Sequence, residues 1–297
     1  MHAFQCVRRF ERRWVALASA LLMSISMPNM GYSQEAVRPS LVDPAVRNGD
    51  TPYLVYTGAS GRHTSPLAVF LPGTNGTTAG APQLLLRMLA DQGYRVIYLS
   101  YDNRVAATKI CPQAPPPCFA QFRASRLFGG GGPVPTAPAE SIVTRLTELL
   151  RYLDREHPND GWDQYLTPDG PKWPTIIMSG LSQGAGMAAY LAKRYPLRRV
   201  VLFSSPWDFR FPDMRPASWL FEASATPTDR WWAERHVREN TTRAIARAYQ
   251  ALRIPTSHIL LFDGPPPPAA TSDNPYHVST VTLDQYIPQW RVMYGVN

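Results

Sequence analysis

Cysteine is scarce in this chain of 297 residues, which contains only three. Two of them, Cys111 and Cys118, lie close together in a Pro-rich stretch, and no cluster of His or Cys accompanies them. Structural zinc sites use four Cys or His ligands, so this pair is a poor candidate for metal binding. We therefore expect no metal site in the chain.

Runs of like charge and nucleotide-binding motifs are also missing. Lys and Arg total 30 against 22 Asp and Glu, but they are scattered, and no nucleic-acid-binding motif is present. The chain has no Walker loop, metal triad or dinucleotide fingerprint. The excess of Lys and Arg predicts a generally basic surface. The missing motifs predict no nucleic-acid partner and no cofactor.

The N-terminus has the pattern of a targeting segment. Four arginines between positions 8 and 13 precede an apolar stretch over residues 14–27 and a small-residue site at 31–33. This order is typical of a secretory signal peptide, so we expect cleavage after Ser33 and a periplasmic or secreted protein of residues 34–297. The apolar stretch is short for a membrane span. An uncleaved anchor is the alternative, and we expect no stable membrane insertion.

Export changes the interpretation of the cysteines. An oxidising compartment favours a disulfide between Cys111 and Cys118. That bridge would fix a small Pro-rich loop rather than hold the fold together.

Apolar runs alternate with helical patterns along the mature chain. Strands are expected at residues 53–56, 67–71, 94–100, 175–178, 199–203, 230–236 and 257–262, and helices at 81–91, 140–156, 185–195, 241–252 and 283–294. This alternation predicts one α/β domain with a mostly parallel sheet and helices on both faces. Residues 102–138 are expected to be an irregular insertion because Pro and Gly are dense there. Residues 206–229 carry several Pro and Trp and could cover a site.

The most informative motif is the pentapeptide Gly-Leu-Ser-Gln-Gly over residues 180–184. It follows an expected strand and precedes an expected helix, an arrangement that lifts Ser182 onto a tight turn. A Cβ atom at either glycine would crowd such a turn. The alternative is an ordinary solvent-exposed Gly/Ser turn.

The chain resembles the α/β-hydrolase family of serine hydrolases in three places. They are this motif, Leu71-Pro-Gly-Thr74 after an early strand, and a late His277 in Asn-Pro-Tyr-His-Val-Ser. The resemblance covers nearly all of the mature chain and is strongest to exported bacterial members of unassigned substrate. It implies the α/β-hydrolase fold and the chain order nucleophile, acid, histidine.

The resemblance implies that Ser182 is the nucleophile and His277 its base. A serine hydroxyl needs a base within hydrogen-bond reach, and His277 lies after the last strand and before the terminal helix, where the family places that base. His258 opens an expected core strand, so we interpret it as structural. His236 ends a strand, where the family would place the acid region.

The acid that orients the imidazole stays open between two residues. Glu239 follows the strand at 230–236, the usual position of the acid, although the usual residue is Asp. Asp208 follows the strand at 199–203, which some members of the family use. Asp263 is a distant third, since it follows the last strand with four prolines close behind.

Two main-chain N–H groups are expected to stabilise an oxyanion. One belongs to Gln183, at the positive end of the helix that follows the serine. The other belongs to Thr74, where Gly73 lets the chain turn. The family often has His-Gly in this loop, and Pro-Gly departs from that pattern. An ordinary Pro-Gly turn is the alternative.

Four tryptophans, Trp207, Trp219, Trp231 and Trp232, lie close to the candidate acids in the sequence. They would either line an acyl pocket or belong to the core. The predicted function is cleavage of carboxylic esters, of small molecules or polymers, through an acyl-enzyme on Ser182. The alternatives are a peptidase, amidase or lyase on the same scaffold, and a non-catalytic binding protein that keeps the fold.

Overall fold

The computed structural model describes residues 31–58, 65–266 and 274–296. Its centre is an eight-stranded sheet in the order β1-β2-β4-β3-β7-β8-β11-β12. β1 pairs antiparallel with β2, and β2 pairs antiparallel with β4, whereas the other neighbours run parallel. The strands are β1 (Tyr32–Val37), β2 (Tyr53–Gly58), β3 (Leu67–Leu71), β4 (Arg95–Tyr98), β7 (Ile176–Leu181), β8 (Arg199–Phe203), β11 (Trp231–His236) and β12 (Ile259–Phe262).

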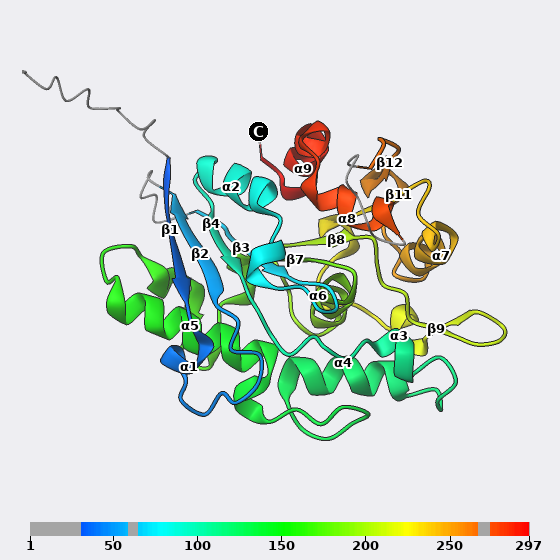
Figure 1. Cartoon of the computed structure of the whole chain (residues 1–297), viewed down its shortest axis with the longest axis horizontal. Coiled ribbons are helices and arrows are strands. Elements are labelled where there is room, and N and C mark those ends of the chain that lie inside the picture. Colours follow the sequence, from blue (N-terminus) through cyan, green and yellow to red (C-terminus); the bar gives the residue numbers. More distant parts are fainter. Residues whose placement is uncertain (1–30, 59–64, 267–273, 297) are drawn as a thin grey trace, which may run out of the picture.

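Helices cover both faces of the sheet, as the alternation of strands and helices predicted (Figure 1). One apolar cluster packs against the first face with side chains from α4 (Cys118–Phe128), α5 (Ile142–Glu156), α6 (Gln183–Arg194) and α7 (Thr242–Ala251). A second cluster packs against the opposite face with side chains from α2 (Gln83–Asp91), α8 (Pro275–Thr282) and α9 (Ile287–Tyr294). Strands buried on both faces explain the nearly continuous apolar runs in the sequence.

The interior of β3 illustrates this burial. Its five residues are all buried, with Val69 in one apolar cluster and Phe70 in the other. α5 is amphipathic, and the side chain of Ser141 caps its N-terminus by accepting a hydrogen bond from the N–H of Thr144. The helix expected at 140–156 is confirmed.

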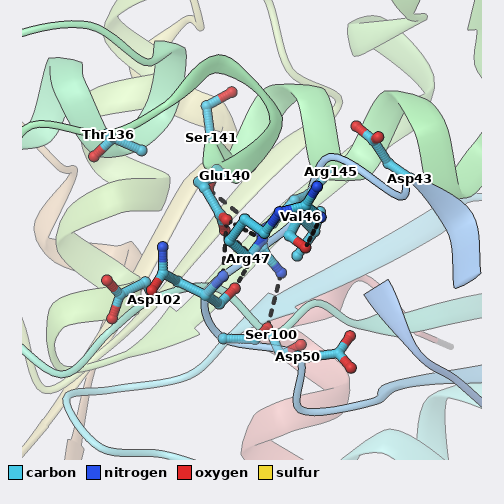
Figure 2. Close-up of polar contacts among 12 residues, drawn as sticks. Asp43, Val46, Arg47, Asp50, Ser100, Asp102, Thr136, Glu140, Ser141 and Arg145 are labelled. Carbon is cyan, nitrogen blue, oxygen red and sulfur yellow. Dashed lines mark hydrogen bonds and ion pairs between the residues drawn. The ribbon is translucent and has the colours of Figure 1, made fainter. Parts of the chain in front are cut away.

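A buried ion pair holds the connection between β1 and β2 against α5 (Figure 2). Arg145 pairs with Glu140, and both side chains are almost fully buried. The other carboxylate oxygen of Glu140 accepts the N–H groups of Arg47, at 2.6 Å, and Asn48, at 2.8 Å. Arg145 donates to the carbonyl of Gly49 at 3.0 Å. Each charge is thus compensated, which keeps this loop ordered beside the sheet.

The expectation of an irregular insertion over residues 102–138 is wrong. α3 (Ala107–Ile110) and α4 lie within it, and Phe119, Phe122 and Leu127 of α4 are buried in the core. The prolines and glycines that suggested a loop gather before and after α4 rather than inside it. Their average density hid a helix of eleven residues.

The expected disulfide between Cys111 and Cys118 is present, with a Cα–Cα distance of 5.4 Å. It joins the end of α3 to the first residue of α4. Both cysteines belong to the buried core. The bridge therefore fixes the connection between two helices that pack beside the sheet.

The two ends of the described chain differ in detail from the expected cleavage site and the expected terminal helix. β1 begins at Tyr32, so cleavage after Ser33 would remove two of its six residues. Residues 1–30 of the expected signal peptide lie outside the described residues. The expected terminal helix is divided into η8 (Asp284–Tyr286) and α9. Across residues 31–58, 65–266 and 274–296, we find no helix with the length and apolarity that crossing a membrane requires.

Candidate active site

Ser182 lies on the turn between β7 and α6 and has φ 55° and ψ −122°. A positive φ is strained for a residue with a side chain, and such strain gathers at functional sites. The flanking glycines allow the turn to pack against β3. A Cβ atom on Gly184 would lie 2.1 Å from the carbonyl oxygen of Leu71, and one on Gly180 would lie 2.6 Å from the carbonyl carbon of Gly184.

The loop after β3 approaches the serine closely. A Cβ atom on Gly73 would lie 3.1 Å from the Cβ of Ser182. The main chain turns back at this point, since the N–H of Gly76 donates to the carbonyl of Gly73 at 3.0 Å. Thr74 and Gln183 both line the cavity that contains Ser182. The two expected oxyanion donors therefore border one cavity with the expected nucleophile.

Asn103 fixes this loop and was not recognised from the sequence. Its side-chain amide donates to the carbonyls of Gly73, at 2.7 Å, and Gly76, at 2.9 Å. The main-chain carbonyl of Asn103 accepts a hydrogen bond from the main-chain N–H of Asn75. A polar residue shortly after a buried strand was the available signal, because the carboxyl ends of parallel strands share one edge of a sheet.

The side chain of Gln183 connects α6 to the segment before α3. Its carbonyl accepts the N–H of Ala107 at 3.2 Å, and its amide donates to the carbonyl of Val105 at 3.1 Å. The Gln183 side chain is thereby engaged in holding one wall of the cavity, and its main-chain N–H stands at the start of α6.

His277 lies in the first turn of α8, a short helix between the last strand, β12, and the terminal helix, α9. Its Nδ1 atom is 2.7 Å from Oε1 of Glu239. The same oxygen accepts the hydroxyl of Thr241 at 3.0 Å, and Oε2 of Glu239 accepts the hydroxyl of Ser204 at 2.8 Å. The Glu239 side chain is fully buried and that of His277 is 13% exposed. His277 and Ser182 line the same cavity.

Asp208 lies elsewhere and has different partners. Its carboxylate forms a buried ion pair with Arg123 of α4 at 2.6 Å and accepts the indole N–H of Trp219 at 2.8 Å. Arg123 also donates to the carbonyl of Gln183 at 3.0 Å. Of the two candidate acids, the structure brings Glu239 to His277 and gives Asp208 to a structural pair that supports the start of α6.

The remaining histidines and the third acid lie away from this arrangement. His236 contacts the carbonyl of Gly264 at 2.8 Å, and burial lowers the pKa of its imidazole. His258 contacts the carbonyl of Trp231 at 3.0 Å and stacks on Trp232. Asp263 is exposed. None of the three lines the cavity that contains Ser182.

That cavity has a volume of about 420 Å³. Its walls are largely apolar and include Phe70, Pro82, Tyr98, Ala106, Trp207 and Val281. The ring of Trp207 lies 4.9 Å from that of His277. Trp219 and Trp231 belong instead to the core. The tryptophans thus divide between the two roles considered, with Trp207 at the site.

The described residues contain no cluster suited to a metal ion. Among them, no group of three or more His, Cys, Asp or Glu side chains could hold one. The cavity brings together a serine on a strained turn, an imidazole paired with a buried carboxylate, and the main chain of Thr74 and Gln183.

Comparisons with known proteins identify the fold. No protein-family model matches the chain, and no curated protein sequence matches it significantly. Solved structures do match. A proposed dienelactone hydrolase from Klebsiella pneumoniae subsp. pneumoniae MGH 78578 has a TM-score of 0.50 at 12% identity, over 90% of this chain and 99% of that one. Esterase B from Lactobacillus rhamnosis, with a C6-C4 SN3 inhibitor, has a TM-score of 0.51 at 14% identity, over 90% and 86%. The chain has the α/β-hydrolase fold, as predicted.

Proposed function

We propose that this protein is a serine hydrolase that cleaves carboxylic esters through an acyl-enzyme on Ser182. His277 is the general base and Glu239 is the acid that orients it. The observation that carries the proposal is the 2.7 Å contact between His277 and the buried Glu239, in a cavity shared with a serine on a strained turn. This combination supports the roles of nucleophile, base and orienting group for the three residues.

The first half of the reaction forms the acyl-enzyme. The Oγ atom of Ser182 attacks the ester carbonyl carbon, and its proton passes to Nε2 of His277. The Glu239 carboxylate stabilises the resulting imidazolium through Nδ1. The N–H groups of Thr74 and Gln183 stabilise the oxyanion, helped by the positive end of α6. The intermediate then collapses, and the departing alcohol takes the proton from Nε2.

The second half releases the acid. A water molecule gives a proton to Nε2 of His277 and attacks the acyl carbon. The new tetrahedral intermediate expels Oγ of Ser182, which recovers the proton from His277. The carboxylic acid leaves, and Ser182 is ready for another ester.

The size and lining of the cavity favour small-molecule esters. A volume of about 420 Å³ with mostly apolar walls suits a compact ligand that is held by shape and oriented by few polar groups. The structural neighbours are consistent with this class, since esterase B was solved with a tributyrin phosphonate. Ester rather than amide cleavage is the form of the proposal that those neighbours support.

An exported location is part of the proposal. The N-terminal pattern of basic, apolar and small residues supports a signal peptide. The disulfide between Cys111 and Cys118 supports an oxidising compartment. Cell fractionation with an antibody to the mature chain would test the location, and recovery in the reducing cytoplasm at full length would contradict it.

Ester hydrolysis by wild type and Ser182→Ala tests the activity. We expect the wild type to hydrolyse p-nitrophenyl esters of short acyl chains, and Ser182→Ala to lose turnover while keeping its circular dichroism spectrum and melting temperature. Turnover that survives in Ser182→Ala would reject the mechanism. A folded wild type without turnover on any ester or amide tested would favour a non-catalytic binding protein.

A further inference from the structure

A second buried carboxyl group lies behind the Glu239–His277 pair. Glu234 occupies the middle of β11, where it pairs with Phe203 of β8 and Leu260 of β12, and it is fully buried. None of the ion pairs in the described part of the chain includes Glu234, and its Oε2 atom has no hydrogen-bond partner. A buried carboxylate without a cation is costly, whereas the neutral acid is not.

Ser204 bridges the two carboxyl groups. It follows β8 with a positive φ of 51°, and its N–H donates to the carbonyl of Glu234 at 3.3 Å. Its hydroxyl oxygen lies 2.8 Å from Oε2 of Glu239 and 3.3 Å from Oε1 of Glu234. The positive φ shows that the backbone is held in an unfavourable conformation, which the surrounding contacts must stabilise.

Ser204 has a single hydroxyl proton for its two contacts with carboxyl groups. A serine hydroxyl donates once and accepts up to twice, so Ser204 cannot donate to two carboxylates. The shorter contact assigns its proton to Glu239. The contact to Glu234 is then satisfied when Oε1 of Glu234 carries a proton and donates it to the hydroxyl oxygen of Ser204.

The electrostatic surroundings favour the protonated form. Burial, and then the charge of Glu239, raise the pKa of Glu234 well above its ordinary value. The hydroxyl of Ser204, and that of Thr280, which donates to the carbonyl of His277 at 3.0 Å, act in the opposite direction. The other titratable groups that face Glu234 are Tyr249 of α7 and Tyr286 of η8, and burial raises the pKa of both phenols. His277 of α8 reaches this cluster only through Glu239.

We propose that Glu234 is a protonated positioning residue, which donates a hydrogen bond through Ser204 to Glu239 and thereby orients Glu239 toward His277. The chain of donors runs from Glu234 to Ser204 to Oε2 of Glu239. Oε1 of Glu239 remains available to accept from His277 and Thr241. One negative charge, on Glu239, faces the imidazole. The role assigned to His277 rests on the proposed function, whereas the protonation of Glu234 does not.

Infrared spectroscopy tests the protonation directly. Wild type at neutral pH should show the carbonyl band of a protonated carboxylic acid, and Glu234→Gln should lack it. Glu148→Gln, at a partly exposed glutamate of α5, is the matched control and should keep the band. Ser204→Ala should keep the band at a shifted frequency, because the hydrogen bond from Glu234 is lost. A folded Glu234→Gln with the wild-type spectrum, or an unshifted band in Ser204→Ala, would overturn the proposal.

Kinetics test the positioning role. Ser204→Ala and Glu234→Leu should each lower kcat about tenfold, the effect of one charge-assisted hydrogen bond, with little change in KM. Glu234→Gln should recover most of the loss, because its amide also donates to Ser204, and should leave the midpoint of the acid limb of kcat/KM in place. Wild-type kcat in Glu234→Leu would refute the role. An acid limb moved to lower pH in Glu234→Gln would show that Glu234 is ionised.

The two proposals fail separately. If wild type hydrolyses no ester, the proposed function falls, and the infrared spectra still decide whether Glu234 is protonated. If wild type is an active esterase and the carboxylic acid band is missing, the proposed function stands and this inference falls.

Discussion

Oε1 of Glu239 lies 2.7 Å from Nδ1 of His277, and both residues reach this contact from separate segments. Glu239 follows β11, and His277 lies in the first turn of α8. The carboxylate is fully buried and accepts two further hydroxyl hydrogen bonds. A carboxylate in this setting fixes the imidazole tautomer that leaves Nε2 free to take a proton.

Glu239→Gln and Asp208→Asn should therefore behave differently. Glu239→Gln should lower kcat roughly 10³- to 10⁴-fold, because a neutral amide does not stabilise an imidazolium. Asp208→Asn should lower the free energy of unfolding by about 3 kcal/mol, because it leaves Arg123 buried without its charge partner. Ester kinetics and urea unfolding of both variants check this. A larger kcat loss in folded Asp208→Asn than in Glu239→Gln would reverse the assignment.

Gly184→Ala should disrupt the turn that carries Ser182. Its new Cβ atom would lie 2.1 Å from the backbone oxygen of Leu71, which neither β3 nor α6 can relieve without moving. We expect a loss of about 3 kcal/mol in unfolding free energy, measured by urea denaturation. Gly131→Ala is the control, because nothing lies within 4 Å of a Cβ atom there. Equal stability of the two variants would contradict the packing described.

Removing the disulfide should loosen one wall of the cavity. Cys111→Ser with Cys118→Ser opens a loop of sequence separation 7, for which loop-closure entropy predicts a loss of about 2.5 kcal/mol. Ala107 and Lys109 of the adjoining α3 line the cavity, so KM should rise more than kcat falls. Unfolding by urea and ester kinetics check both effects. An unchanged unfolding free energy would show that the connection is held by packing alone.

The stability of the protein should depend on pH through Glu234. Burial raises the pKa of Glu234 in the folded state above the ordinary value of 4.5. Above that pH the unfolded chain loses this proton while the native state keeps it, so the native state is destabilised as pH rises. Relative to Glu234→Gln, wild type should lose up to about 1.4 kcal/mol of unfolding free energy per pH unit. Urea unfolding between about pH 5 and pH 7 measures this, and a constant difference would contradict it.

The turn that carries Ser182 and the central sheet could be predicted from the sequence, because local residue patterns specify them. Glycines at 180 and 184 indicate a turn too crowded for a Cβ atom. Apolar runs that alternate with helical patterns indicate a parallel sheet covered by helices. α4 was not predicted because the prolines and glycines on either side of it were averaged with the residues of the helix itself. The spacing of Phe119, Phe122 and Leu127 was the signal that could have revealed the helix.

Contacts between segments that are distant in the chain could not be predicted from the sequence. Asp208 pairs with Arg123, 85 residues away, and nothing in either local sequence identifies the partner. Both candidate acids follow parallel strands at the same edge of the sheet, so topology alone could not separate them. Glu234 lies within the expected strand at 230–236, and Ser204 directly follows the expected strand at 199–203. Their importance comes only from the contacts that link Glu234 to Ser204 and Ser204 to Glu239.

The central claim is that Ser182 is an activated nucleophile, and covalent labelling with a fluorophosphonate probe tests it most directly. We expect stoichiometric labelling of wild type, located to the Ser182 peptide by mass spectrometry, and no labelling of Ser182→Ala. Glu239→Gln should label much more slowly than wild type because its imidazole lacks the orienting carboxylate. A folded wild type that the probe does not label, or a label on any residue other than Ser182, would contradict the account.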